Sequence, residues 1–235
     1  KRLPLINGTT LINISEYLNY IEKLKYSYGK NKNKVGNIQI LKFKKNFIYF
    51  DTGSPPEKKF SKSYQSGPLS FEYFLDGEKI ITNCGYGLNI SRKAKLLSRL
   101  TSAQSTLCIN DTSVIKFERN KIINSAFGNS IKSSFKVSNI TNEDNDLITS
   151  TSASHDAYEN NFGCNHFREI KIDKKTNILY GMDKIINNQI GVKKKFCIFF
   201  HLFPGISAVP TLGGNSILIH IKKNKSLIFQ SSNQN

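Results

Sequence analysis

The chain has 235 residues, with 34 Lys and Arg against 17 Asp and Glu, which gives a formal net charge of +17. Hydrophobic residues make up 38% and aromatic residues 11%, so the composition excludes a disordered chain and predicts a sizeable core. No apolar run is long enough to cross a bilayer, and no transmembrane segment is expected.

The positive charge is spread through turns rather than gathered in one motif. Lysines occur in segments such as "KNKNK", "DKKTN" and "VKKK", and turn or edge positions usually carry solvated charge. No helix-turn-helix or RNA-binding aromatic motif accompanies them. Specific nucleic-acid binding is therefore not expected, whereas a general attraction for polyanions, acidic polysaccharides included, stays open.

The first predicted element is an amphipathic helix. Residues 11–28, "LINISEYLNYIEKLKYSY", place apolar side chains at helical spacing, and "GKNKNKVGN" ends the helix. We assign residues 1–36 to a helical connector and residues 37–235 to a β domain.

After the helix, the hydrophobic period changes to two. "NIQILKF" and "NFIYFD" predict a hairpin across a short Lys-Lys-Asn turn. Further strands are predicted at "LSFEYFL", "KIITNCG", "STLCIN", "SVIKFE", "SFKVSNI", "HFREIKID", "ILYGMDKI", "KKFCIFFHL", "SAVPTL", "SILIHIK" and "SLIFQ". Many short strands separated by turns predict an all-β fold, either a sandwich or a closed sheet.

The four cysteines show no metal-site or redox spacing. Cys84, Cys108, Cys164 and Cys197 form no CxxC pair and have no His at ligand spacing, so we expect buried free thiols, with a disulfide as the open alternative.

One loop-like segment, "SASHDAYENNFG", offers the best catalytic candidates. Asp156 could orient the imidazole of His155 and raise its basicity, and Tyr158 could act as a proton donor or base. The alternatives are a strand cap, a turn cap and a packed tyrosine. Arg99 could pair with a sugar carboxylate or simply be a surface residue. Of the remaining histidines, His166 is expected to be half-buried in a sheet, His201 to pack in the core and His220 to face outward.

Five motifs occur in a fixed order along the chain: "DTGSPP", "GPLSFEYFLDGEKIITNCG", "SRLTSAQSTLCINDTS", "SASHDAYENNFGCNHFREIKID" and "FFHLFPGI". This ordered set resembles the C-terminal β domain of heparinase II/III-like proteins, most closely the branch found in alphaproteobacteria. The resemblance extends from Leu3 to about residue 220. It implies a large antiparallel two-sheet β-sandwich that follows an (α/α) toroid, so the predicted helix would be the end of that toroid.

The resemblance also implies an activity. Characterised members of the family are polysaccharide lyases that act by β-elimination on uronic-acid-containing glycans, with most catalytic groups on the toroid. It implies a periplasmic or cell-envelope location, an acidic polysaccharide as partner, and contact with the chain's own toroid. The β domain alone is not expected to be active.

Three positions depart from the family's pattern. Where the resemblance implies His, Asp and His as ligands of a structural zinc, this sequence has Gln65, Asn83 and Gln104. Neutral amides are poor zinc ligands, so no metal and no other cofactor is expected, and we assign these three residues to substrate binding together with Arg99 and Asp156. The alternative function is a non-catalytic β module that binds glycan or supports the toroid.

Overall fold

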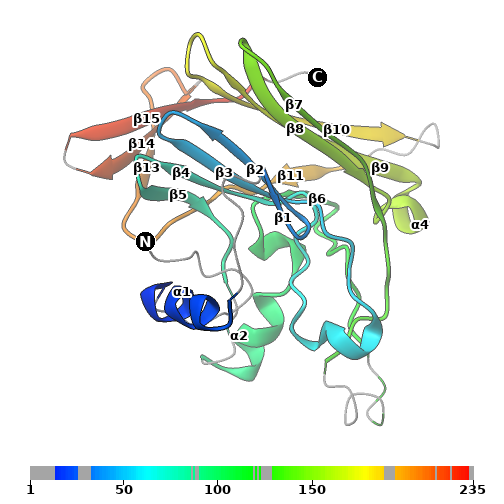
Figure 1. Cartoon of the computed structure of the whole chain (residues 1–235). Helices are drawn as coiled ribbons and strands as arrows, with labels where there is room; N and C mark the ends of the chain where they lie inside the picture. Colours follow the sequence, from blue (N-terminus) through cyan, green and yellow to red (C-terminus); the bar gives the residue numbers. More distant parts are fainter. Residues whose placement is uncertain are drawn as a thin grey trace.

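The computed structural model describes residues 14–25, 33–85, 87, 90–118, 120, 122, 129–187, 194–214, 216–222 and 224–232. Within these ranges the chain consists mostly of antiparallel sheets with a few short helices (Figure 1). The predicted all-β class and the β-sandwich are confirmed. Two larger sheets form the layers, and a two-stranded and a three-stranded sheet extend them.

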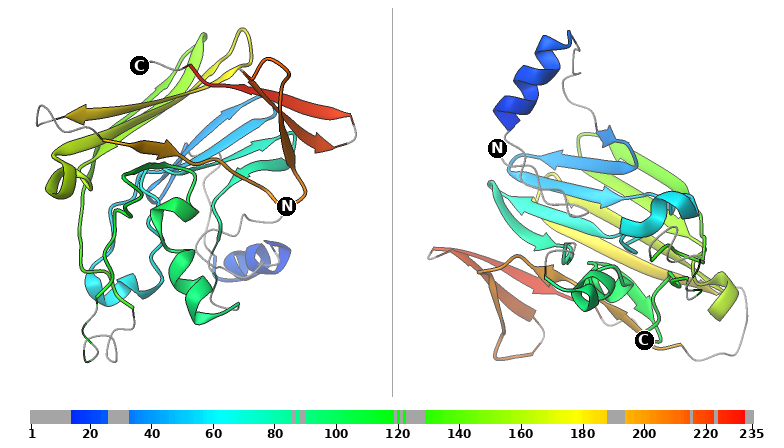
Figure 2. Two further views of the ribbon diagram at one scale, coloured as in Figure 1. Left: turned by 180° about the vertical axis from the view of Figure 1, so that it is seen from behind. Right: turned by 90° about the horizontal axis from the view of Figure 1, so that it is seen from below.

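The first helix, α1 (Ile14–Lys23), is shorter than the predicted one, and residues 11–13 and 26–28 lie outside the described residues. It extends away from the strands (Figure 2), and its Tyr20 side chain is 60% exposed. The domain boundary at residue 36 stays a prediction.

The first layer is a six-stranded sheet in the order β1-β2-β3-β4-β5-β12. Its strands are β1 (Lys34–Val35), β2 (Ile38–Phe43), β3 (Asn46–Asp51), β4 (Phe71–Leu75), β5 (Glu78–Thr82) and β12 (His201–Leu202). The predicted hairpin is confirmed, since β2 and β3 pair antiparallel from Ile38↔Asp51 to Phe43↔Asn46. Burial alternates along β3, with Ile48 and Phe50 facing the core.

The second layer is a four-stranded sheet in the order β10-β9-β8-β7, which covers one face of the first (Figure 1). Its strands are β7 (Val137–Asp144), β8 (Ile148–His155), β9 (Cys164–Asp173) and β10 (Leu179–Asn187). Ile170 and Ile172 of β9 and Ala153 of β8 belong to the buried core shared with β3. A hydrogen bond of 3.1 Å from Asn142 Nδ2 to Gln39 Oε1 links the two layers.

The strand β8 is absent from the sequence prediction, which placed His155 in a loop. Its sequence, "ITSTSASH", lacks alternating apolar residues, yet seven of its eight residues are buried. The strand pairs with β7 on one side and β9 on the other, so its neighbours stabilise it rather than its own hydrophobic pattern.

Two other strand predictions need correction. "SVIKFE" forms only an isolated bridge, Phe117↔Ile131. "KKFCIFFHL" divides into β11 (Phe196–Ile198), which pairs with β6 (Leu107–Ile109), and β12, which joins the first layer. The rest of the sheet structure is β13 (Ser207–Pro210), β14 (Ser216–Lys222) and β15 (Lys225–Gln230).

Short helices lie on the face of the first layer that points away from the second layer, as Figure 1 shows for α2 (Arg92–Leu97). The other short helices are η1 (Lys58–Ser63), η3 (Thr101–Ala103) and α4 (Glu159–Phe162). All four cysteines are free thiols, as expected; Cys108 and Cys164 are buried, whereas Cys84 is exposed and Cys197 is half-buried, contrary to expectation. No helix in the described ranges is long and apolar enough to cross a membrane.

Candidate functional site

The three predicted amide residues gather beside the C-terminal end of β5. The Oδ1 atom of Asn83 accepts a hydrogen bond of 2.8 Å from the backbone N–H of Ser105, the residue after Gln104. The Gln65 side chain is buried, and its Nε2 donates to the carbonyl of Gly85, two residues after Asn83. We call Gln65, Asn83 and Gln104 the amide cluster.

Gln104 lies at the C-terminal end of η3. Its side chain is 2% exposed, and Nε2 donates to the carbonyl of Ser98 at 2.8 Å. Gly67 packs directly against it, because a Cβ added at Gly67 would lie 3.0 Å from Gln104 Cγ. Gln104 is therefore held by the fold.

The amide cluster does not fit the zinc that the resemblance implies. Asn83 Nδ2 donates to Ser70 Oγ at 3.3 Å while its Oδ1 accepts from Ser105, so both ends of this amide have protein partners. The amide nitrogens of Gln65 and Gln104 likewise donate to backbone carbonyls. Among the described residues, no three His, Cys, Asp or Glu side chains converge in a metal-binding arrangement.

Arg99 is fully buried, with 0% exposure, and does not reach the surface where a sugar carboxylate would bind. Its guanidinium donates to the carbonyls of Ser61, Tyr64 and Asn129 at 2.7–2.9 Å. It also lies 4.6 Å from the centre of the Phe117 ring. These contacts tie η1 and two loops together.

His155 ends the buried strand β8 and is 1% exposed, contrary to its expected loop position. Asp156 does not orient it: Asp156 Oδ1 accepts from the backbone N–H of Lys136 at 2.7 Å, and Asp156 is exposed. His155 instead pairs with His166, which lies directly opposite on β9 and is fully buried rather than half-buried.

A chain of hydrogen bonds fixes the protons of both imidazoles. The backbone N–H of Ala157 donates to His155 Nδ1 at 3.2 Å, so a neutral His155 carries its proton on Nε2. That proton is donated to His166 Nδ1 at 3.1 Å, and His166 Nε2 donates to Asp183 Oδ1 at 2.6 Å. The chain is complete with both imidazoles neutral.

The electrostatics agree with neutral imidazoles. Burial lowers the pKa of His155 well below its ordinary value, and electrostatic interactions with His166 and with the charged Arg168 lower it further. Burial also lowers the pKa of His166, although its hydrogen bond to Asp183 acts in the opposite direction. Burial alone would raise the pKa of Asp183, but the charge of Arg168 and the hydrogen bonds from His166 and Arg168 hold it at about 2.

Arg168 completes this cluster, and the sequence analysis did not select it. Its guanidinium donates to both carboxylate oxygens of Asp183, at 2.7 and 3.0 Å, and to the carbonyls of Leu69 and Ser105, each at 2.9 Å. The second layer is thereby joined to the backbone next to Gln104. One signal was present in "HFREIKID", because the alternation places Arg168 on the same inward face as Ile170.

Tyr158 is a packed residue with 0% exposure. Its hydroxyl donates to the carbonyl of Leu107 at 3.0 Å, and burial raises its pKa. A buried, protonated phenol is badly suited to remove a proton from a substrate. Tyr158 lies beside His155, with ring centres 5.5 Å apart, so these two predicted residues do come together.

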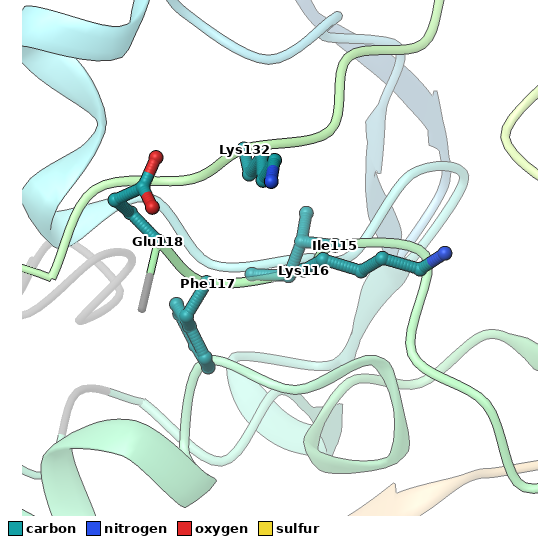
Figure 3. A pocket seen from close by; sticks show the side chains of 5 residues that line it. All are labelled: Ile115, Lys116, Phe117, Glu118 and Lys132. Carbon is teal, nitrogen blue, oxygen red and sulfur yellow. The ribbon is translucent and has the colours of Figure 1, made fainter. Parts of the chain in front are cut away.

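A separate pocket of about 530 Å³ lies between the segments around residues 115–118 and 132 (Figure 3). Phe117 forms one side, beneath Arg99, and Glu118 is ion-paired with Lys58 at 2.9 Å. Lys116 and Lys132 give the pocket a basic character. None of the predicted site residues lines it.

The chain is similar to one known protein family. The family described as heparinase II/III-like, C-terminal, matches residues 29–235. The chain belongs to the heparinase II/III-like family. Among functionally curated proteins, none matches the chain.

Solved structures share the fold. A mutant of the heparan sulfate lyase HepC from Pedobacter heparinus is 14% identical, with a TM-score of 0.72 over 99% of this chain and 36% of that chain. Unmutated HepC gives 14% identity and a TM-score of 0.68 over 94% and 34% of the two chains. A heparinase III structure is 15% identical, with a TM-score of 0.56 over 81% and 27%. This heparinase II/III-like chain thus spans about a third of the length of the structures it matches.

Proposed function

We propose that the chain is the C-terminal β-sandwich of a polysaccharide lyase acting on uronic-acid-containing acidic glycans, and that it forms one wall of the substrate cleft. The family match over residues 29–235 is the observation that carries this proposal. The names of the matched structures, a heparan sulfate lyase and a heparinase III, support an acidic polysaccharide as the substrate class. The formal charge of +17 would favour such a substrate.

The proposal places the chemistry mainly outside this chain. A base removes the proton from C5 of the uronate, the bond from C4 to the leaving oxygen breaks, the leaving oxygen takes up a proton, and an unsaturated uronate forms. An N-terminal toroid would supply the base, with residues 1–36 as the connector to it. The parent protein would work in the periplasm or cell envelope.

Within this chain, the residues divide by exposure. His155, Tyr158 and Arg99 are buried, and we assign them to holding the wall in shape. Asn83 is half-buried and Asp156 is exposed, so these are the predicted residues whose side chains reach solvent. Gln65 and Gln104 are buried and donate to backbone carbonyls, so we assign them to holding the loops rather than to the cleft surface.

The test is an assay of the full parent polypeptide for the ultraviolet absorbance of unsaturated uronate. Heparan sulfate, alginate and related uronate polymers would be incubated separately, with a neutral glycan as the control. We expect absorbance to rise with at least one uronate polymer. Absence of signal across the whole panel would refute the lyase proposal.

The amide cluster favours a second candidate function. Because amides occupy the positions where the resemblance implies zinc ligands, the chain fits a non-catalytic β module that binds glycan or supports the toroid. Glycan binding without elimination in the same assay would favour this alternative.

A further inference from the structure

A row of polar side chains crosses the first layer on the face away from the second layer. Tyr49 of β3 lies opposite Glu72 of β4, and Thr82 of β5 donates to Glu72 Oε1 at 3.3 Å. Thr82 in turn lies opposite His201 of β12. The row therefore ends at His201, on the edge strand of the sheet.

Glu72 and Thr82, in the middle of the row, have partners within the protein, whereas His201 is open on one side. Glu72, 2% exposed, lies 2.8 Å from the ammonium group of Lys79, and Thr82 is 9% exposed. His201 is only half-buried, contrary to its expected core position. Together with Tyr49 at the opposite end of the row, which is also half-buried, it gives the row access to solvent.

The backbone fixes the orientation of the His201 ring. Nε2 lies 2.9 Å from the carbonyl oxygen of Ser102, which can only accept, so Nε2 carries a proton. In the neutral ring the lone pair is then on Nδ1. Nδ1 has no hydrogen-bond partner within the described part of the chain. The fold thus presents an oriented acceptor.

His201 is also linked to the amide cluster through Ser105. Its backbone N–H donates to Ser105 Oγ at 2.9 Å, and the backbone N–H of Ser105 donates to Asn83 Oδ1 at 2.8 Å. One residue therefore holds both His201 and Asn83, the half-buried member of the cluster.

One aromatic ring packs against the imidazole, and a second, exposed one follows it in the chain. Phe199 stacks parallel to it, with ring centres 6.0 Å apart and an interplanar angle of 5°. Phe203, two residues after His201, is 43% exposed. Sugar rings have apolar C–H faces beside hydroxyl groups, and a site for them combines aromatic surface with a few oriented polar atoms.

We propose that Phe199, His201 and Phe203 form a sugar-binding site in which Nδ1 of His201 accepts a hydrogen bond from a hydroxyl of an acidic glycan. We call these residues the His201 site. The inference rests on the proposed function for its ligand class and adds a contact residue that the sequence analysis assigned to packing. Asn83 is linked to this site through Ser105, which hydrogen-bonds both to the backbone of His201 and to the side chain of Asn83.

The test is footprinting of the unmodified chain with diethyl pyrocarbonate, which reacts with an imidazole lone pair. His220 on β14 is exposed and serves as the internal control, while the buried His155 and His166 should not react. Short heparan sulfate and alginate oligosaccharides are the probes, and calorimetry on the same samples records whether they bind. Mass spectrometry then gives the modification rate of each histidine.

We expect a bound glycan to slow modification of His201 at least about fivefold and to leave the rate at His220 unchanged. His201→Ala should weaken binding by about tenfold, whereas His220→Ala should not, matching the loss of one hydrogen bond at a neutral acceptor. Glycan binding without protection of His201 would overturn this inference and leave the proposed function standing. No binding of either glycan by calorimetry would also overturn this inference, whereas the proposed function is decided by the absorbance assay of the parent polypeptide.

Discussion

At the scale of single residues, Arg168 carries the largest electrostatic consequence. Arg168 is 2% exposed, and its charge is compensated by Asp183 and by the carbonyls of Leu69 and Ser105. We expect Arg168→Met to lower the free energy of unfolding by about 3–5 kcal/mol, since removing one partner leaves a buried carboxylate and carbonyls unpaired. Urea denaturation at neutral pH measures this.

Two controls separate the buried charge from a general effect of substitution. Lys45→Met breaks an ion pair whose side chains are 69% and 46% exposed, and it should leave the urea midpoint unchanged. The double variant Arg168→Met with Asp183→Asn should recover a large part of the loss, because it leaves no unpaired carboxylate. A single variant as stable as the parent chain would contradict the interpretation.

The buried histidine pair predicts a dependence of stability on pH. Both imidazoles have lowered pKa values in the folded chain because they are buried, whereas unfolded histidine titrates near about 6.5. Below that pH the unfolded chain binds protons that the folded chain does not, so stability falls as pH falls. Lowering the pH from about 7.5 to about 5 should decrease the free energy of unfolding by at most about 2 kcal/mol per histidine.

Asp51 changes stability in the opposite direction and must be removed for a clear measurement. Burial raises its pKa to about 6, although a hydrogen bond from the Gly53 N–H opposes the shift. The folded chain therefore takes up a proton at Asp51 as pH falls through about 6, which gains stability. In Asp51→Asn, the free energy of unfolding should therefore fall more between neutral and acidic pH than it does in the unsubstituted chain. Adding His166→Gln to Asp51→Asn should reduce this loss of stability on acidification, whereas adding His220→Gln should not. Equal stability of Asp51→Asn at both pH values would contradict the prediction.

At the scale of elements, the turn before β4 depends on a glycine. A Cβ at Gly67 would lie 2.8 Å from Ser70 Oγ and 3.0 Å from Gln104 Cγ, which is too close for ordinary packing. We expect Gly67→Ala to lower the free energy of unfolding by about 1–3 kcal/mol through overpacking. Gly181→Ala in β10 is the matched control, since its Cβ meets nothing within 4 Å, and thermal unfolding of both variants gives the comparison. Equal effects at the two positions would count against the packing argument.

The elements also show what the sequence could predict. The hairpin of β2 and β3 was predictable because apolar residues alternate across a short lysine turn, where Lys44 has a φ of 50°. The strand β8 was not, because its Ser and Thr residues are buried by pairing on both sides and by no pattern of their own. That omission also moved His155 from a buried strand to an expected loop.

In the candidate site, too, the contacts that the sequence did not predict depend on tertiary structure. The resemblance drew attention to Gln65, Asn83 and Gln104, whose proximity depends on loops that bring together residues far apart in sequence. The pairing of His155 with His166 depends on the register between β8 and β9, and the capture of Asp183 depends on the register between β9 and β10. Register between strands joined by variable loops is not encoded in local periodicity.

At the scale of the whole molecule, the excess of 34 basic over 17 acidic residues is the dominant feature. We expect binding of heparan sulfate to weaken by about tenfold or more as sodium chloride rises from about 50 mM to about 300 mM, because screening shortens the range of the summed field. Calorimetry at several salt concentrations measures this, with a neutral glycan of matched length as the control. Because the positive charge is dispersed over turns, substituting any single exposed lysine should change the affinity far less than this change in salt does. Binding that is independent of salt would assign recognition to the uncharged contacts at the His201 site instead of to the overall field.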